Sequence, residues 1–127
     1  MSVRIGADGR IHVASGAVAM GQSTKTMLAQ LVAEQLGGDM GNITVTTCDT
    51  AAIALGFGGF NSRQAVMAGS SAHAEALKVR EKLLKVASQM LEAAQEDLEI
   101  EGGNVRVKGS DLRRFSRIAT NCSIGNR

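Results

Sequence analysis

The stretch that decides the fold is GQSTKTMLAQLVAEQLGGDMGNITVTTC, which runs from residue 21 to residue 48. Its apolar side chains recur at helical spacing between Thr24 and Leu36, and Gly37-Gly38 supplies the left-handed residue that ends many helices. The run Ile43–Cys48 is rich in β-branched residues, as strands are. The stretch therefore predicts a helix over residues 24–36 that leads into a strand.

The residues before this stretch predict a hairpin. Two short β-branched runs, Val3–Ile5 and Ile11–Val13, flank Gly6-Ala7-Asp8-Gly9. Asp-Gly between such runs is a strong hairpin signal. A strand, a helix and a strand in succession then favour a right-handed crossover onto one sheet.

The longest predicted helix lies between Gln64 and Asp97, and two adjacent apolar stripes give it one broad apolar face. A surface helix needs a narrower stripe, so we expect a sheet and a second element to cover this face. Its first third, residues 65–76, consists almost entirely of small residues. This composition predicts either very close packing or a break near Gly69-Ser70-Ser71.

The C-terminal part predicts a second hairpin and a last helix. Residues 98–101 and 105–108 alternate apolar and charged side chains around Gly102-Gly103-Asn104. Ser110 is the expected cap of the last helix. The predicted fold class is α/β, of the α+β kind. It is a single domain over residues 1–127 with a mixed sheet, the order ββαβαββα and a long helix packed on one face.

Composition excludes several classes of function. Lys and Arg exceed Asp and Glu by only 14 to 12, and the chain has three Phe and neither Trp nor Tyr. Nucleic-acid binding normally needs a clustered basic face or aromatic stacking residues, so we expect none. No apolar run is long enough to span a membrane, and Met1–Gly6 enters structure without a signal peptide. Cys48 and Cys122 match no metal or redox spacing, which indicates small apolar roles and a cytoplasmic location.

Two glycine-containing loops carry the chemistry. Gly21–Thr26 precedes the first helix, whose first amides have no internal partner and can therefore meet an anion. The alternative is that Ser23 or Thr24 simply caps the helix. The second loop, Gly56–Arg63, opens the longest helix. Its Arg63 is suited either to binding a phosphate or to pairing with Asp49 or a backbone carbonyl. His12 and His73 lack neighbours at ligand spacing, so we expect surface histidines and no metal site.

These motifs occur in an order that resembles a known family. Gly-Gln-Ser-Thr-Lys-Thr, the helix ending Ala33-Glu34-Gln35-Leu36-Gly37, Asp49-Thr50 and the glycine-rich loop before Ser62-Arg63 follow one another. The order is similar to that of the molybdenum-cofactor-binding large subunit of xanthine dehydrogenase, aldehyde oxidase and carbon monoxide dehydrogenase. The resemblance extends from about Val3 to Lys108.

The resemblance implies a site for molybdopterin or molybdopterin cytosine dinucleotide, built from two loops at helix N-termini. It assigns Gln22 as a hydrogen-bond partner of the molybdenum centre. The implied cofactor-binding residues of the two loops are Gly21, Gln22, Ser23 and Thr26, and Gly58, Gly59, Ser62 and Arg63.

The chain departs from the family pattern at several points. Ser23 stands where the family has its second glycine, and Asn61 stands where many members have a small residue. A Cβ at Ser23 would crowd a phosphate that passes close to the backbone. None of the seven glutamates follows a glycine, as the family's catalytic glutamate does, and no cysteine cluster could hold iron and sulfur.

Two functions therefore compete. In the first, the chain is an excised or free-standing segment of a molybdenum hydroxylase that binds cofactor, carries no catalytic residue and is inactive alone. In the second, it is a non-enzymatic module that keeps the fold, has lost the cofactor and self-associates or binds a partner. Both predict contact with other copies or with other segments or subunits of a hydroxylase.

Overall fold

The computed structural model describes residues 1–56 and 58–109. The predicted last helix from Ser110 lies outside the described residues. The described elements, in chain order, are β1 (Ser2–Ile5), β2 (Ile11–Ser15), α1 (Thr24–Leu36), the 3₁₀ turn η1 (Met40–Asn42), β3 (Ile43–Thr47), α2 (Ser62–Leu91), the 3₁₀ turn η2 (Gln95–Asp97), β4 (Leu98–Glu101) and β5 (Asn104–Val107).

The first sheet has β2 at its centre. β1 pairs with it antiparallel, so that Val3 faces Val13, and β3 pairs with it parallel, so that Val13 faces Val45. The parallel pair confirms that the chain crosses over through α1. The predicted α/β class with a mixed sheet is therefore confirmed.

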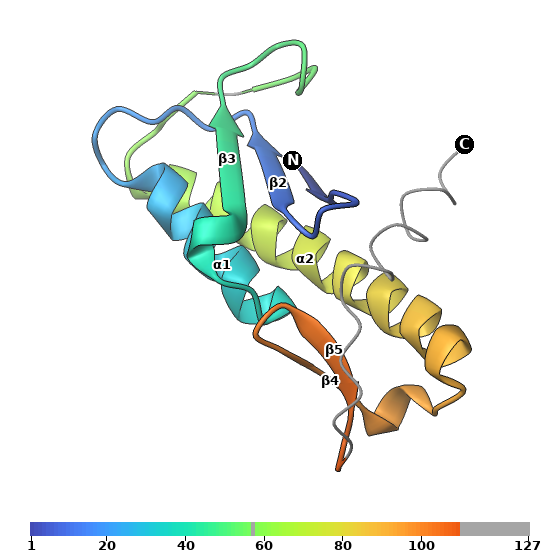
Figure 1. Ribbon diagram of the computed structural model, residues 1–127. Helices are drawn as coiled ribbons and strands as arrows, with labels where there is room; N and C mark the ends of the chain where they lie inside the picture. The colour runs from blue at the N-terminus through green and yellow to red at the C-terminus, as the bar shows by residue number, and fades with distance from the viewer. Residues whose placement is uncertain (57, 110–127) are drawn as a thin grey trace.

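Both helices cover one face of this sheet (Figure 1). Helix α1 begins and ends where the sequence predicts, with Gly37 left-handed at its C-terminus. The core combines inward strand residues with apolar side chains of α1 and closely packed alanines of α2. Its buried members are Val3, Ile11, Val13, Leu28, Val32, Leu36, Ala72 and Ala76.

Helix α2 runs without a break through its small-residue third. A Cβ at Gly69 would lie 3.3 Å from the Leu31 Cδ1 atom, so the small residues serve close packing against α1. The predicted end at Asp97 was wrong. The helix stops at Leu91 because Glu92 turns left-handed, with φ 51°, and residues 95–97 form a separate 3₁₀ turn.

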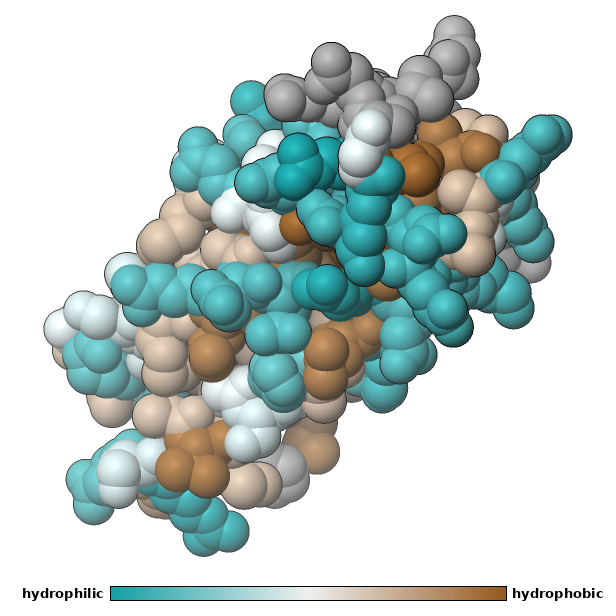
Figure 2. Space-filling model, turned by 90° about the horizontal axis from the view of Figure 1, so that it is seen from below, coloured by the Kyte–Doolittle hydropathy of each residue, from teal (hydrophilic) through white to brown (hydrophobic). Residues whose placement is uncertain are grey.

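The second hairpin, β4–β5, forms a sheet of its own beside the second half of α2. Leu98 and Val105 of the hairpin pack against Leu83 and Ala87 of the helix, and all four are buried. The hairpin is thus the second element that the broad apolar face of α2 required. Seen from below, the surface mixes hydrophilic side chains with smaller hydrophobic patches and shows no continuous apolar face (Figure 2).

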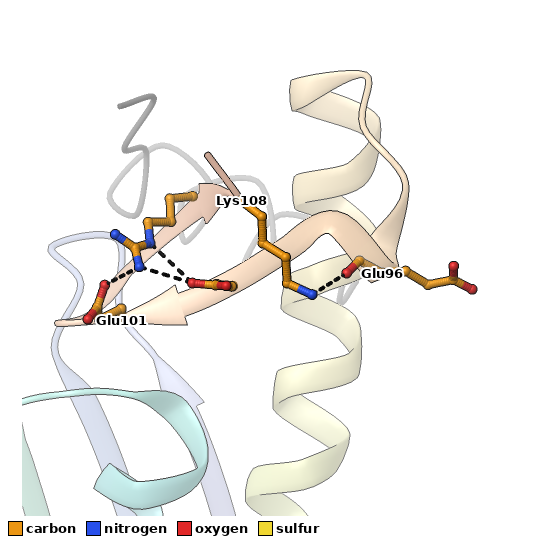
Figure 3. Close-up of polar contacts among 5 residues, drawn as sticks. Glu96, Glu101 and Lys108 are labelled. Atoms are coloured by element: carbon orange, nitrogen blue, oxygen red, sulfur yellow. Dashed lines mark hydrogen bonds and ion pairs between the residues drawn. The ribbon is translucent and has the colours of Figure 1, made fainter. Parts of the chain in front are cut away.

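Charged groups hold the hairpin together on its outer side. Arg106 lies 3.0 Å from Glu99 and 2.8 Å from Glu101, measured from its Nη2 to the carboxylate oxygens. Lys108 donates from Nζ to the Glu96 carbonyl at 2.8 Å, which ties β5 to η2 (Figure 3). Within the described part of the chain, no helix has the length and apolar character that a membrane span requires.

Candidate functional site: two loops at the helix starts

The first loop comprises residues 16–23, between β2 and α1, and the second loop comprises residues 49–61, between β3 and α2. Since β2 and β3 are parallel neighbours, both loops leave the same edge of the sheet. Both helices begin at this end, on the left of Figure 1. The two backbones touch, because a Cβ at Gly16 would lie 2.7 Å from the Gly56 Cα. The contact lies just outside the predicted site segments Gly21–Thr26 and Gly58–Arg63, whose joint binding site stays a prediction.

The first backbone amides of α1 have no hydrogen-bond partner among the described residues. Ser23 is left-handed, with φ 60°, and its side chain makes no capping bond. The structure gives no hydrogen bond to the amides of Thr24, Lys25 and Thr26, while the Met27 amide bonds the Ser23 carbonyl. The alternative of a helix capped by Ser23 or Thr24 was therefore wrong.

Gly21 and Gln22 shape the rest of the first loop. Gly21 has φ 96°, and a Cβ there would meet nothing within 4 Å. The Gln22 side chain folds back onto its own loop. Its oxygen accepts from the Met20 amide at 2.6 Å, and its nitrogen donates to the Val18 carbonyl at 2.9 Å. Its amide is thus held in one orientation, although the residue is exposed.

The second loop ends in unusual backbone. Gly58 has φ 74° and open space where a Cβ would be. Asn61, directly before α2, has φ 48° and ψ −141°, which is a conformation that glycine adopts far more readily. Ser23 and Asn61, the two departures from the family pattern, therefore both occupy backbone that suits glycine. This gives a conformational reason for the family's small residues, separate from the space that a phosphate needs.

Arg63 and Lys25 place one cation in the first turn of each helix. Both are exposed, and among the described residues neither side chain has a hydrogen-bond or ion-pair partner. Asp49, the partner considered for Arg63, instead accepts from the Ala51 amide at 2.9 Å. No acidic residue lies in the first turn of either helix. The positive ends of both helices and two free cations thus favour an anion.

Sequence reasoning missed Lys25 and also Gln64. Gln64 is buried, at 8% exposure, and bonds three groups of the first loop and the start of α1. The sequence signal that could have identified Gln64 is its position in the first turn of a helix, as an amide side chain among small and apolar residues. Ser62 and Thr26, both predicted site residues, are exposed at the helix starts.

Other chemical groups do not gather into a site. Within the described ranges, no three His, Cys, Asp or Glu side chains could hold a metal ion, and His12 and His73 are exposed. Cys48 is exposed as well, and its thiol donates to the Ala17 carbonyl at 3.4 Å, so its predicted apolar role was wrong. The hydrogen bond that the Lys78 ammonium donates to the Glu75 carboxylate, at 2.8 Å, raises the pKa of Lys78, on the surface of α2.

Exposed apolar side chains surround the loops. We call them the apolar rim. Each is between 62% and 69% exposed, and each lies in one of the two loops or in the first two turns of α2: Met20, Leu55, Phe60, Val66 and Met67. Where such exposed apolar side chains form a patch, the patch marks a contact site for other proteins or segments.

Comparison with known proteins identifies the family. The sequence matches the molybdopterin cofactor-binding domain over residues 1–126. The chain belongs to this family. It is 43% identical over 80 residues to the 6-hydroxypseudooxynicotine dehydrogenase complex subunit gamma of Paenarthrobacter nicotinovorans, and the match covers 63% of the chain and 10% of that subunit. It is 38% identical over 77 residues to a putative xanthine dehydrogenase molybdenum-binding subunit of Escherichia coli, covering 60% and 10%.

Solved structures agree with this assignment. Quinoline 2-oxidoreductase from Pseudomonas putida 86 superposes with a TM-score of 0.83 at 32% identity, over 98% of this chain and 16% of that one. CO dehydrogenase from Oligotropha carboxidovorans gives 0.79 at 29% identity, over 92% and 15%. The chain thus spans about a tenth of the length of the curated relatives it matches. It is homologous to one segment of a molybdenum hydroxylase large subunit.

The residues of the two loops suit the anionic part of the family's cofactor. Amides and two cations without partners among the described residues, together with two glycines that face open space, can receive phosphate oxygens. Ser23 adds a side chain to this surface, but its hydroxyl is exposed and free of a capping bond.

Proposed function

We propose that this chain is the phosphate-binding segment of a molybdenum-hydroxylase cofactor domain. The observation that carries the proposal is the exposed Arg63 in the first turn of α2, whose guanidinium has no partner among the described residues. Gly21, Gln22, Ser23 and Thr26 form one side of this site, and Gly58, Gly59, Ser62 and Arg63 form the other. The group to be held is molybdopterin or its cytosine dinucleotide, whose molybdenum centre supplies the redox chemistry when bound.

The roles of the chain's own residues follow from their positions. The amides of Thr24–Thr26 offer neutral donors at the positive end of α1, while Lys25 and Arg63 offer charged ones. The Gln22 side-chain amide bonds Met20, Val18 and Gln64 and so fixes the shape of the loop that carries the Gln22 and Ser23 backbone. These groups bind and orient an anion. None of them is assigned a catalytic role.

Calorimetric titration of the 127-residue chain with cytidine diphosphate tests the proposal. We expect saturable heat at sub-millimolar to millimolar ligand, and competition by inorganic pyrophosphate. Cytidine serves as the control and should give no comparable heat. Absence of heat from cytidine diphosphate in a folded sample would contradict the proposal and leave only the fold inherited.

We also propose, from the apolar rim, that this end of the chain contacts another protein segment. Its five exposed side chains lie in the two loops and the first two turns of α2, which also carry the proposed cofactor-binding residues. The chain spans a small part of its relatives, and the remaining segments of such a subunit are the partner we propose. A second copy of the chain is the competing occupant, as expected for a self-associating module.

Sedimentation equilibrium distinguishes these occupants. If the apolar rim contacts only the remaining hydroxylase segments, the chain should be monomeric. If the rim joins two copies of the chain, a dimer should form, and the double variant Phe60→Ser, Met67→Ser should dissociate it.

We also expect the chain alone to oxidise neither aldehydes nor purines, because it lacks the family's catalytic glutamate. Turnover by the purified chain would contradict this assignment.

A further inference from the structure

Gln64 is the most deeply buried polar side chain at the start of α2. Its nitrogen donates to the Val18 carbonyl and lies 3.4 Å from the Thr24 Oγ1, while its oxygen accepts from the Gln22 side-chain nitrogen at 3.4 Å. A buried amide with all its partners in place holds a defined geometry, and losing one partner is costly. Here those partners come from 40 or more residues away in the sequence.

Gln64 makes three of the described hydrogen bonds that join the two connections, reaching the first loop and the start of α1 from the start of α2. The Cys48 thiol, directly after β3, adds a longer bond to the Ala17 carbonyl at 3.4 Å, and the two backbones approach closely at Gly16 and Gly56. Gln64 is therefore the side chain that makes most of the hydrogen bonds between the two connections.

Gly59 makes room for this arrangement. A Cβ at Gly59 would overlap the Gln64 side-chain oxygen and lie 3.2 Å from the Met20 Cε. The absence of a side chain at Gly59 thus allows the second loop to pass over the amide.

We propose that Gln64 is the positioning residue of the two-loop site. It holds the carbonyl of Val18, the hydroxyl of Thr24 and the amide of Gln22 at a set distance from the start of α2, and thereby sets the anion-binding geometry of the first loop. The consequence for anion binding rests on the proposed function, whereas the effect on the loop can be measured without ligand.

The first experiment compares Gln64→Leu with Gln89→Leu, an exposed position on the same helix, by backbone and side-chain amide NMR of the full chain. In Gln64→Leu we expect shifted resonances and lower order parameters for Met20 and Gln22, with Val105 of the distant hairpin unchanged. Gln89→Leu should leave all three as in the wild type. An unchanged first loop in a folded Gln64→Leu chain would overturn the proposal.

Gln64→Glu tests the hydrogen bond separately from packing, because only the hydrogen bond should make the order of the first loop depend on pH. A carboxylate has the length of glutamine but cannot donate to the Val18 carbonyl, whereas the protonated acid can. None of the three partners of Gln64 titrates. We expect first-loop order to be lost at neutral pH and partly restored at acidic pH, relative to the wild type at each pH. A pH-independent loop in this variant would count against the proposal.

Titration with inorganic pyrophosphate separates the two proposals. If the wild type binds and Gln64→Leu binds at least tenfold more weakly, both are supported. If both bind equally, the role of Gln64 in positioning is overturned and the proposed function stands. If the wild type does not bind, the proposed function fails, and the loop measurements alone decide whether Gln64 positions the loops.

Discussion

The two ends of the molecule differ in how well their apolar side chains are buried and their charged side chains are paired. At the hairpin end, Leu83 and Val105 are fully buried, and the Arg106 guanidinium pairs with two carboxylates. At the loop end, Arg63 has no partner among the described residues, and Asn61 is in strained backbone. Apolar side chains are buried at the first end and exposed around the second.

This difference indicates that the hairpin end contributes more to stability, whereas the loop end is suited to binding. Sites that bind ligands commonly keep unpaired groups and strained backbone that the rest of the fold must support. The hairpin end supplies that support by burying apolar surface. The predictions below change one end at a time and ask whether the other end responds.

The largest effect is expected from Leu83→Ala at the hairpin end. Removing a fully buried leucine leaves a cavity between α2 and the hairpin, so we expect the free energy of unfolding to fall by about 2–5 kcal/mol. Urea denaturation measures this loss. Leu77→Ala on the same helix is the control, because Leu77 is 38% exposed and should cost much less. Equal losses would show that the hairpin end contributes no special stability.

Arg63→Ala should weaken cytidine diphosphate binding by about 1–3 kcal/mol, because a charge-assisted contact is lost. Its free energy of unfolding should stay within about 0.5 kcal/mol of the wild type, since Arg63 is exposed and has no partner among the described residues. Lys82→Ala, an exposed cation further along α2, controls for net charge. If both variants weaken binding alike, the ligand senses overall charge and not this residue.

Asn61→Gly should stabilise the protein. Backbone of this kind costs of order 1–3 kcal/mol for a residue with a side chain, while glycine adds about 0.5–1 kcal/mol of unfolded-state entropy. We expect a net gain of about 1 kcal/mol in urea denaturation. Asn42→Gly, an exposed asparagine without positive φ, should instead destabilise slightly. A loss of stability on Asn61→Gly would show that the asparagine makes a compensating interaction.

Glu101→Ala should have the smallest effect. Its side chain is 66% exposed, and Arg106 keeps its contact with Glu99 when Glu101 is removed. We expect a loss below about 0.5 kcal/mol that disappears in high salt, as for other surface ion pairs. Denaturation at low and high salt measures it. A loss that persists in high salt would mean that Glu101 acts through packing.

Much of the fold could be predicted because its signals are local. Helix α1 has its predicted bounds, since its apolar spacing and Gly37 are both within a few residues of its ends. Both hairpins form where predicted, although β5 runs from Asn104 to Val107, so Asn104 pairs with Glu101 and does not belong to the turn. The end of α2 could not be predicted, because the apolar spacing continues past Leu91 while the backbone turns at Glu92.

The candidate site was predicted only as a set of residues. The two loops were identified from motif order, and their adjacency followed from parallel strands. Lys25 was missed because a lysine at a helix start lies outside the family motif. Gln64 was missed because its importance comes from the burial of its amide and from partners in another loop.

The sequence by itself determined the helices, the strands and the family, because periodicity, glycine position and motif order are properties of neighbouring residues. Only the tertiary structure decided that the hairpin forms a separate sheet on α2 and that Ser23 and Asn61 take glycine-like backbone. It also decided that the Thr24 hydroxyl meets Gln64 instead of capping its own helix. These outcomes depend on contacts between distant segments, where burial and competing hydrogen bonds outweigh local preference.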